Sequence, residues 1–122
     1  MKDLLISFSF KRRRVLIHKS TLRALNLPQN IRFLLNTEKR CMAVQSCAPI
    51  DRDNFAVPDL STVYQYEITS ISFLDIVYKL AKWDNEKTYR VIGLLYPVNQ
   101  LVEFRLSEAM QISDDEFVDD DL

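Results

Sequence analysis

The order of expected elements repeats along this 122-residue chain, and the repetition restricts the folds available to it. In each half, a short β-strand precedes a helix, and two further strands form a hairpin. We place the two units at residues 1–48 and 64–107, joined by a linker at 49–63. One unit cannot bury both faces of its hairpin, whereas two packed units could form a small, closed or nearly closed β-barrel without free edges. We therefore predict one α+β domain over residues 1–113, followed by an acidic tail at 114–122.

Local signals place the elements of both units. Apolar and polar residues alternate in LLISFSF, and RVLI continues as a short buried strand. Ser20 or Thr21 caps a helix that runs to Leu25, after which Asn26 adopts the left-handed conformation and Pro28 prevents continuation. IRFLLN and CMAVQSC follow as a hairpin. In the second unit, YQYEITS is the expected strand and TYRVIGLLY with QLVEFRL the hairpin. The helix between them, ISFLDIVYKLAKW, carries an apolar stripe of Phe73, Ile76, Val77, Leu80 and Trp83.

Charge is divided unevenly between the halves, although the formal net charge is only -1. Residues 1–50 contain ten lysine and arginine residues against two acidic ones, and residues 51–122 contain six against fifteen. Six of these acids lie in the last ten residues, SDDEFVDDDL. Such a division indicates a basic face with an anionic partner. The tail has the composition of a disordered segment.

The run RRVLIHKSTLRALNLPQNIRFLLNTEKRCMAVQ resembles the AbrB/MazE/MraZ-like swapped-hairpin β-barrel family. The first strand of that family usually reads R-V-(V/L)-I-P. Residues 14–17 of this chain match it, with His18 in place of the proline. The family's helix, L-R-x-x-L-G-(I/L), is matched less closely by Leu22, Arg23, Leu25 and Leu27, with Asn26 in place of the glycine. The resemblance covers residues 5–47 and implies a protein that binds DNA, either as a dimer of single units or as a chain of two units.

The basic stretch KRRRVLIHKS has no counterpart in the second unit, where TVYQYEITSIS contains no cation and one acid, Glu67. A two-unit barrel would then be basic on one side only. This asymmetry favours a homodimer that brings two basic halves together. It also leaves the second half available to a protein partner.

We predict that six cations contact the phosphates of duplex DNA: Lys11, Arg12, Arg13, Arg14, Lys19 and Arg23. If residues 11–14 form a strand, at most half of them face one partner, whereas a loop removes that limit. Three alternatives remain open: a solvated strand edge that resists aggregation, a patch neutralised by the chain's own tail, and an acidic protein partner.

The acidic tail supports the competing hypothesis of a protein-binding module. Antitoxins that resemble this family join a DNA-binding barrel to an acidic segment that docks on a toxin. The corresponding contacts here are Asp114, Asp115, Glu116 and Phe117. The tail could instead bind the basic patch of its own chain, imitate nucleic acid towards a basic protein, or act only as a solubilising end.

Other function classes find little support. His18 is the only histidine, and no nucleophile or carboxylate is tied to it by recognisable spacing, so we expect no enzyme. Gly93 is the only glycine, which excludes glycine-rich phosphate loops, and Cys41 and Cys47 lack zinc-ligand spacing. We therefore expect no metal and no cofactor. No apolar run approaches the roughly 18 residues of a membrane span, and no secretory signal pattern is present, so we expect a cytoplasmic protein.

Overall fold

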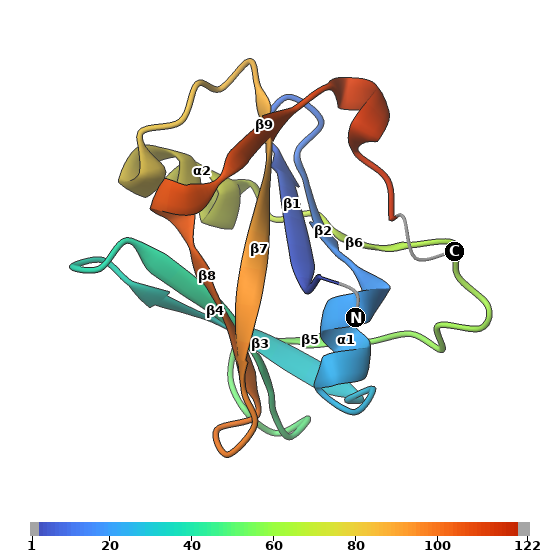
Figure 1. Cartoon of the computed structure of the whole chain (residues 1–122). Helices are drawn as coiled ribbons and strands as arrows, with labels where there is room; N and C mark the ends of the chain where they lie inside the picture. Colours follow the sequence, from blue (N-terminus) through green and yellow to red (C-terminus); the bar gives the residue numbers. More distant parts are fainter. Residues whose placement is uncertain (1–2, 120–122) are drawn as a thin grey trace.

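The computed structural model describes residues 3–119, which form a small, mostly β domain (Figure 1). One curled sheet forms a half-barrel, and the helices are few and short. The strands are β1 (Leu5–Ser9), β2 (Arg14–Ile17), β3 (Asn30–Asn36), β4 (Cys41–Ser46), β5 (Asn54–Ala56), β6 (Tyr66–Ile68), β7 (Thr88–Tyr96), β8 (Leu101–Arg105) and β9 (Met110–Ile112). The helices are α1 (Lys19–Ala24) and α2 (Ile71–Ala81), with the short 3-10 helices η1 (Leu106–Glu108) and η2 (Asp114–Glu116).

The strand order is β5-β3-β4-β8-β7-β1-β2-β6, and β9 pairs with β7. All of these pairs are antiparallel. The expected barrel does not close in the described part of the chain, because the end strands β5 and β6 do not pair with each other. Each has only three residues, and the loop between them contains Pro58. A side-chain bond spans this opening, since the Tyr66 hydroxyl donates to the Ala56 carbonyl over 2.8 Å.

The core lies on the inner face of the curl, where α2 packs against the sheet. Phe8 and Tyr78 both pack against Trp83, with ring centroids 5.4 and 5.2 Å away, and Trp83 stacks on Tyr89 at 4.4 Å. The Tyr78 hydroxyl donates to the Lys87 carbonyl over 2.8 Å, and burial raises the pKa of this phenol. These contacts fix α2 against β1 and β7.

Several local predictions need correction. The helix α1 begins at Lys19, so its N-cap is His18 and not Ser20 or Thr21, and no side chain caps it. The Thr21 hydroxyl donates to the Leu5 carbonyl instead. Residues 49–63 were expected to be a linker, but they contain β5, which pairs with β3. On α2, the buried face is formed by Leu74, Val77 and Tyr78, and Ile76 is exposed.

Other local expectations are confirmed. Asn26 has a φ of 61° after α1, as predicted. The two hairpins form at the expected places, as β3 with β4 and β7 with β8. Beyond these expectations, Cys41 and Cys47 are free cysteines, and burial raises the pKa of each thiol. Neither helix in residues 3–119 has the length and hydrophobicity needed to cross a membrane.

The tail departs most from expectation. Residues 114–119 were expected to be disordered, but they form η2 and then pack against the sheet. Phe117 is 2% exposed and Asp119 is fully buried. Disorder was predicted from composition alone, and composition does not show that individual carboxylates accept hydrogen bonds from distant parts of the fold. The remaining tail positions, 120–122, lie outside the described residues.

Candidate nucleic-acid interface

The basic stretch forms the turn between β1 and β2 rather than a strand. Arg13 has a left-handed backbone with a φ of 58°, and its N–H donates to the Phe10 carbonyl over 3.1 Å. The Arg12 N–H donates to the Ser9 hydroxyl, which tightens the turn. Lys11, Arg12 and Arg13 are exposed as a result, and the strand-face limit on how many cations can reach one partner does not apply to them.

Three of these four cations contact other side chains of the same chain. Lys11 Nζ lies 3.7 Å from Asp114 Oδ2, and Arg14 Nε lies 3.5 Å from Glu67 Oε2. The Arg12 guanidinium lies over the Phe117 ring, 5.8 Å from its centroid. Arg13 forms no ion pair with any residue between 3 and 119, so its guanidinium is the most available of the four.

The structure places the other two predicted phosphate contacts elsewhere. Lys19 is buried at the start of α1, and its backbone N–H donates to Asp119 Oδ2 over 2.8 Å. Arg23 is exposed on α1, at the opposite end of β2 from the turn. Since β2 has four residues, about 13 Å of strand separates the two ends. The six cations therefore do not form one patch.

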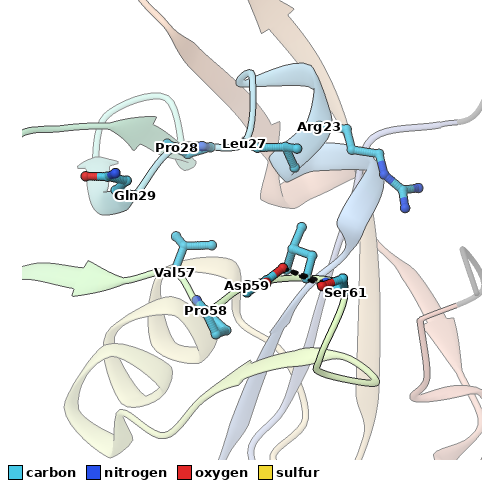
Figure 2. A pocket seen from close by; sticks show the side chains of 9 residues that line it. Arg23, Leu27, Pro28, Gln29, Val57, Pro58, Asp59 and Ser61 are labelled. Atoms are coloured by element: carbon cyan, nitrogen blue, oxygen red, sulfur yellow. Dashed lines mark hydrogen bonds between the residues drawn. The ribbon is translucent and has the colours of Figure 1, made fainter.

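Arg23 borders a cleft of about 450 Å³ between two loops (Figure 2). Leu27 and Pro28 lie on one side of this cleft, and Val57 and Pro58 lie on the other. The nearby Asp59 accepts hydrogen bonds from the Ser61 N–H and hydroxyl, which hold the pKa of Asp59 below its usual value. The cleft thus has a mixed polar and apolar lining, and its carboxylate already accepts hydrogen bonds from its own loop.

Residues 113–119 cover the outer face of β1, β2 and β7 (Figure 1). The segment begins with a capping box, in which Ser113 donates from its N–H and hydroxyl to Glu116 Oε1. These bonds lower the pKa of Glu116. The segment then continues to Phe117, whose side chain is buried, and to Asp119. Of the four proposed protein contacts, Asp115 and Glu116 are exposed, Asp114 is partly exposed, and Phe117 is covered.

A buried polar network links this segment to the sheet. Arg90 Nε donates to Ser7 Oγ over 3.0 Å, and the same oxygen is hydrogen-bonded to His18 Nε2 at 2.8 Å. His18 Nδ1, on the other side of the ring, lies 3.5 Å from Asp119 Oδ1. Arg90 also donates through its terminal nitrogen to the carbonyls of Glu116 and Val118, over 2.6 and 3.1 Å.

The members of this network are buried. Ser7 has no exposed surface, and His18 is 1% exposed. The guanidinium of Arg90 donates to Ser7 Oγ and to two carbonyls of residues 113–119. The network therefore joins β1 and β7 to this segment.

Sequence reasoning missed Ser7, Thr88, Arg90 and Asp119 as members of this site. The alternation of LLISFSF does place Ser7 and Ser9 on the face opposite Ile6 and Phe8. The charge division left open that the tail binds the basic patch of its own chain, but it did not indicate that the tail reaches the Ser7 face of β1 and β7.

No protein-family model, curated protein or solved structure matches this chain. The family resemblance stated above therefore rests on the sequence motif of residues 5–47 alone.

Proposed function

We propose that the protein is a DNA-binding, transcriptional-regulator-like protein that contacts duplex phosphates through the turn between β1 and β2. One observation carries the proposal: three consecutive cations, Lys11, Arg12 and Arg13, are exposed on a single tight turn. A projecting turn can approach the phosphates that border a groove, and arginine donates two parallel hydrogen bonds to one phosphate. Such contacts provide sequence-independent affinity that falls with salt.

The proposal includes a duplication of the kind found in the swapped-hairpin barrels that the sequence resembles. The strand pairing supports it, since β4 pairs with β8 and β2 with β6. In addition, β1 of the first unit pairs with β7 of the second, and β5, which lies in the expected linker, pairs with β3 of the first unit. Both hairpin turns end in a left-handed residue, Arg40 and Gln100, each with a φ of 52°.

The proposal also includes a homodimer acting in the cytoplasm. Under the duplication, the connection between β5 and β6 corresponds to the cationic turn, yet residues 57–65 contain Asp59 and no cation. One chain then offers one cationic turn, and two chains offer two to a single duplex. Sedimentation of a protein–duplex mixture tests this point, with two chains per short duplex as the expected result.

The central experiment measures binding to a mixed duplex pool at low and moderate salt. We expect Arg13→Ala to weaken binding more than Arg14→Ala, because Arg14 is partly buried and paired with Glu67. Each lost phosphate contact should reduce the slope of log affinity against log salt by about 0.9. The matched control is Lys39→Ala/Arg40→Ala, which removes two exposed cations from the β3–β4 turn. Equal losses from the control and from Arg12→Ala/Arg13→Ala would contradict a localised interface.

The alternative of a protein-binding module acting through the acidic half and tail ranks second. Its main apolar anchor, Phe117, is buried against the chain itself, and Asp114 contacts Lys11 and Thr88. A partner would first have to displace the segment. If the wild-type protein binds no duplex even at low salt, this alternative becomes the leading one.

A further inference from the structure

The outer face of β1 and β7 is polar and buried, which is an unusual combination for a sheet in a small domain. The register pairs Ser7 with Arg90 and Ser9 with Thr88, so the four side chains lie on one face. All four are buried. The opposite face of the same strands carries the apolar core. Leu16 of β2 pairs with Ser7, lies on the same face and is also fully buried. Residues 113–119 thus cover a face that combines these four polar side chains with one leucine.

The covering segment supplies acceptors to that surface. Asp114 Oδ1 accepts from the Thr88 hydroxyl over 2.9 Å, and two carbonyls accept from Arg90. Asp119 accepts from the Lys19 N–H and faces His18. The segment also carries four acids between positions 114 and 119. An anionic chain of oxygen acceptors laid over cations, hydroxyls and amides has the bonding pattern of a nucleic-acid backbone on a protein.

We propose that this face is a phosphate-binding surface for a nucleic-acid backbone, continuous with the cationic turn, and that residues 113–119 occupy it as an intramolecular competitor. The inference rests on the proposed function and deepens it, because it adds Thr88, Arg90 and His18 to the surface that meets phosphates. Lys11 and Arg12 connect the cationic turn to this face, since they contact Asp114 and Phe117 of the segment.

A phosphate ligand could replace most of the contacts that hold residues 113–119 on the sheet. The polar contacts of the segment are hydrogen bonds and ion pairs that phosphate oxygens can also make. Its one large buried side chain is Phe117. Displacement leaves β9 paired with β7, so residues 113–119 can swing away while the rest of the chain stays folded. Because Arg90 then loses its carbonyl acceptors, the uncovered face favours an anion.

The experiment compares the full chain with variants that loosen the segment without changing its charge. Phe117→Ala removes the apolar anchor and keeps every cation and acid. Fluorescence anisotropy with a labelled mixed-sequence duplex measures affinity at low salt. Hydrogen exchange of the Lys19 amide, which donates to Asp119, reports opening of the segment independently of binding. Thermal unfolding shows that each variant is folded at the assay temperature.

We expect Phe117→Ala to accelerate exchange of the Lys19 amide and to tighten duplex binding by roughly fivefold or more, as the uncovered fraction rises. Adding Arg90→Gln to this variant should remove most of the gain, because the uncovered face then lacks its arginine. Asp115→Asn is the matched control for the charge of the segment, since Asp115 is exposed. Asp115→Asn should change duplex affinity less than Asp119→Asn does. Asp119→Asn removes the same charge but also weakens the buried contact with the Lys19 N–H.

Several outcomes overturn the inference. Faster Lys19 exchange in Phe117→Ala with unchanged or weaker duplex binding shows that the segment is only a structural cover. Wild-type exchange in Phe117→Ala/Asp119→Asn shows that the segment cannot be displaced. In both cases, wild-type binding that depends on Arg13 leaves the proposed function standing. Failure of the wild type and of every folded variant to bind at low salt overturns the proposed function and this inference together.

Discussion

The Lys19 N–H donates a 2.8 Å hydrogen bond to Asp119 Oδ2, although the two residues are 100 positions apart in the chain. The other carboxylate oxygen of Asp119 lies 3.5 Å from His18 Nδ1, and the Asp119 side chain is fully buried. Hydrogen bonds to an ionised acceptor are stronger than neutral ones. This contact therefore fastens residues 113–119 to the start of α1.

The first prediction concerns the stability that this contact supplies. Asp119→Asn keeps the shape of the side chain but removes its charge, and we expect the free energy of unfolding to fall by about 1.5–3 kcal/mol. Urea denaturation followed by the fluorescence of Trp83, the only tryptophan, measures the change. The exposed Asp115→Asn should stay within about 0.5 kcal/mol of wild type. Equal losses in the two variants would show that the buried contact is not the cause.

The second prediction compares two buried serines. Ser7→Ala leaves Arg90 Nε and His18 without the oxygen that they share, so we expect a loss of about 2 kcal/mol. Ser20 Oγ is buried and has no hydrogen-bond partner among the described residues. Ser20→Ala makes the same chemical change in a helix and should be neutral or slightly stabilising. Chemical denaturation of both variants tests the contrast, and similar losses would contradict it.

A third prediction concerns Gly93 on β7. A Cβ at this position would lie 2.4 Å from Val102 Cγ1 and 2.6 Å from Phe104 Cε1. Gly93→Ala should therefore destabilise the protein by about 1–3 kcal/mol through overpacking, despite the better strand propensity of alanine. Combining it with Val102→Ala supplies space for the added methyl group. The double variant should then cost less than the sum of the two single variants, and simple additivity would count against the packing explanation.

The fourth prediction links Tyr66 to alkaline stability. Burial raises the pKa of Tyr66 to about 12 from an ordinary value of 10.0. Between these values the unfolded chain binds fewer protons than the folded chain, so stability should fall as pH rises from 10 to 12. Tyr66→Phe should weaken this dependence. Tyr78, whose pKa is also raised by burial, contributes in the same direction and remains.

The same variant has a separate effect at neutral pH. Tyr66→Phe removes the bond from the hydroxyl to the Ala56 carbonyl and should cost about 1 kcal/mol. The exposed Tyr64→Phe is the matched control at this pH and should stay within about 0.5 kcal/mol of wild type. Urea denaturation at pH 7 and across the alkaline range separates the two effects.

Local patterns predicted much of the element order. Ile6 and Phe8 alternate with Ser7 and Ser9, which is sufficient to identify β1. Both hairpins have polar turns between apolar strands, and Asn26 follows α1 in the left-handed conformation as expected. These features depend on residues close in sequence, so local sequence patterns are sufficient to predict them.

Features that depend on distant residues were not predictable in this way. The strand β5 forms because β3 offers it an edge, whereas its own sequence contains turn-forming residues. Arg13 occupies a left-handed turn position without the glycine or asparagine that usually marks one. The burial of Asp119 depends on contacts with His18 and Lys19 at the start of α1, which a composition of acidic residues does not reveal.

The pairing of β1 with β7 also has a kinetic meaning. Ser7 meets Arg90 across this pair, and β2 and β4 likewise take partners from the second half of the chain. A ribosome that has released only the first half has produced β1, β2 and β4, each of which still lacks one of its two partner strands. Loop-closure entropy must be overcome before these distant contacts form, which slows folding. Until β7 leaves the ribosome, one edge of β1 remains unpaired and open to other chains.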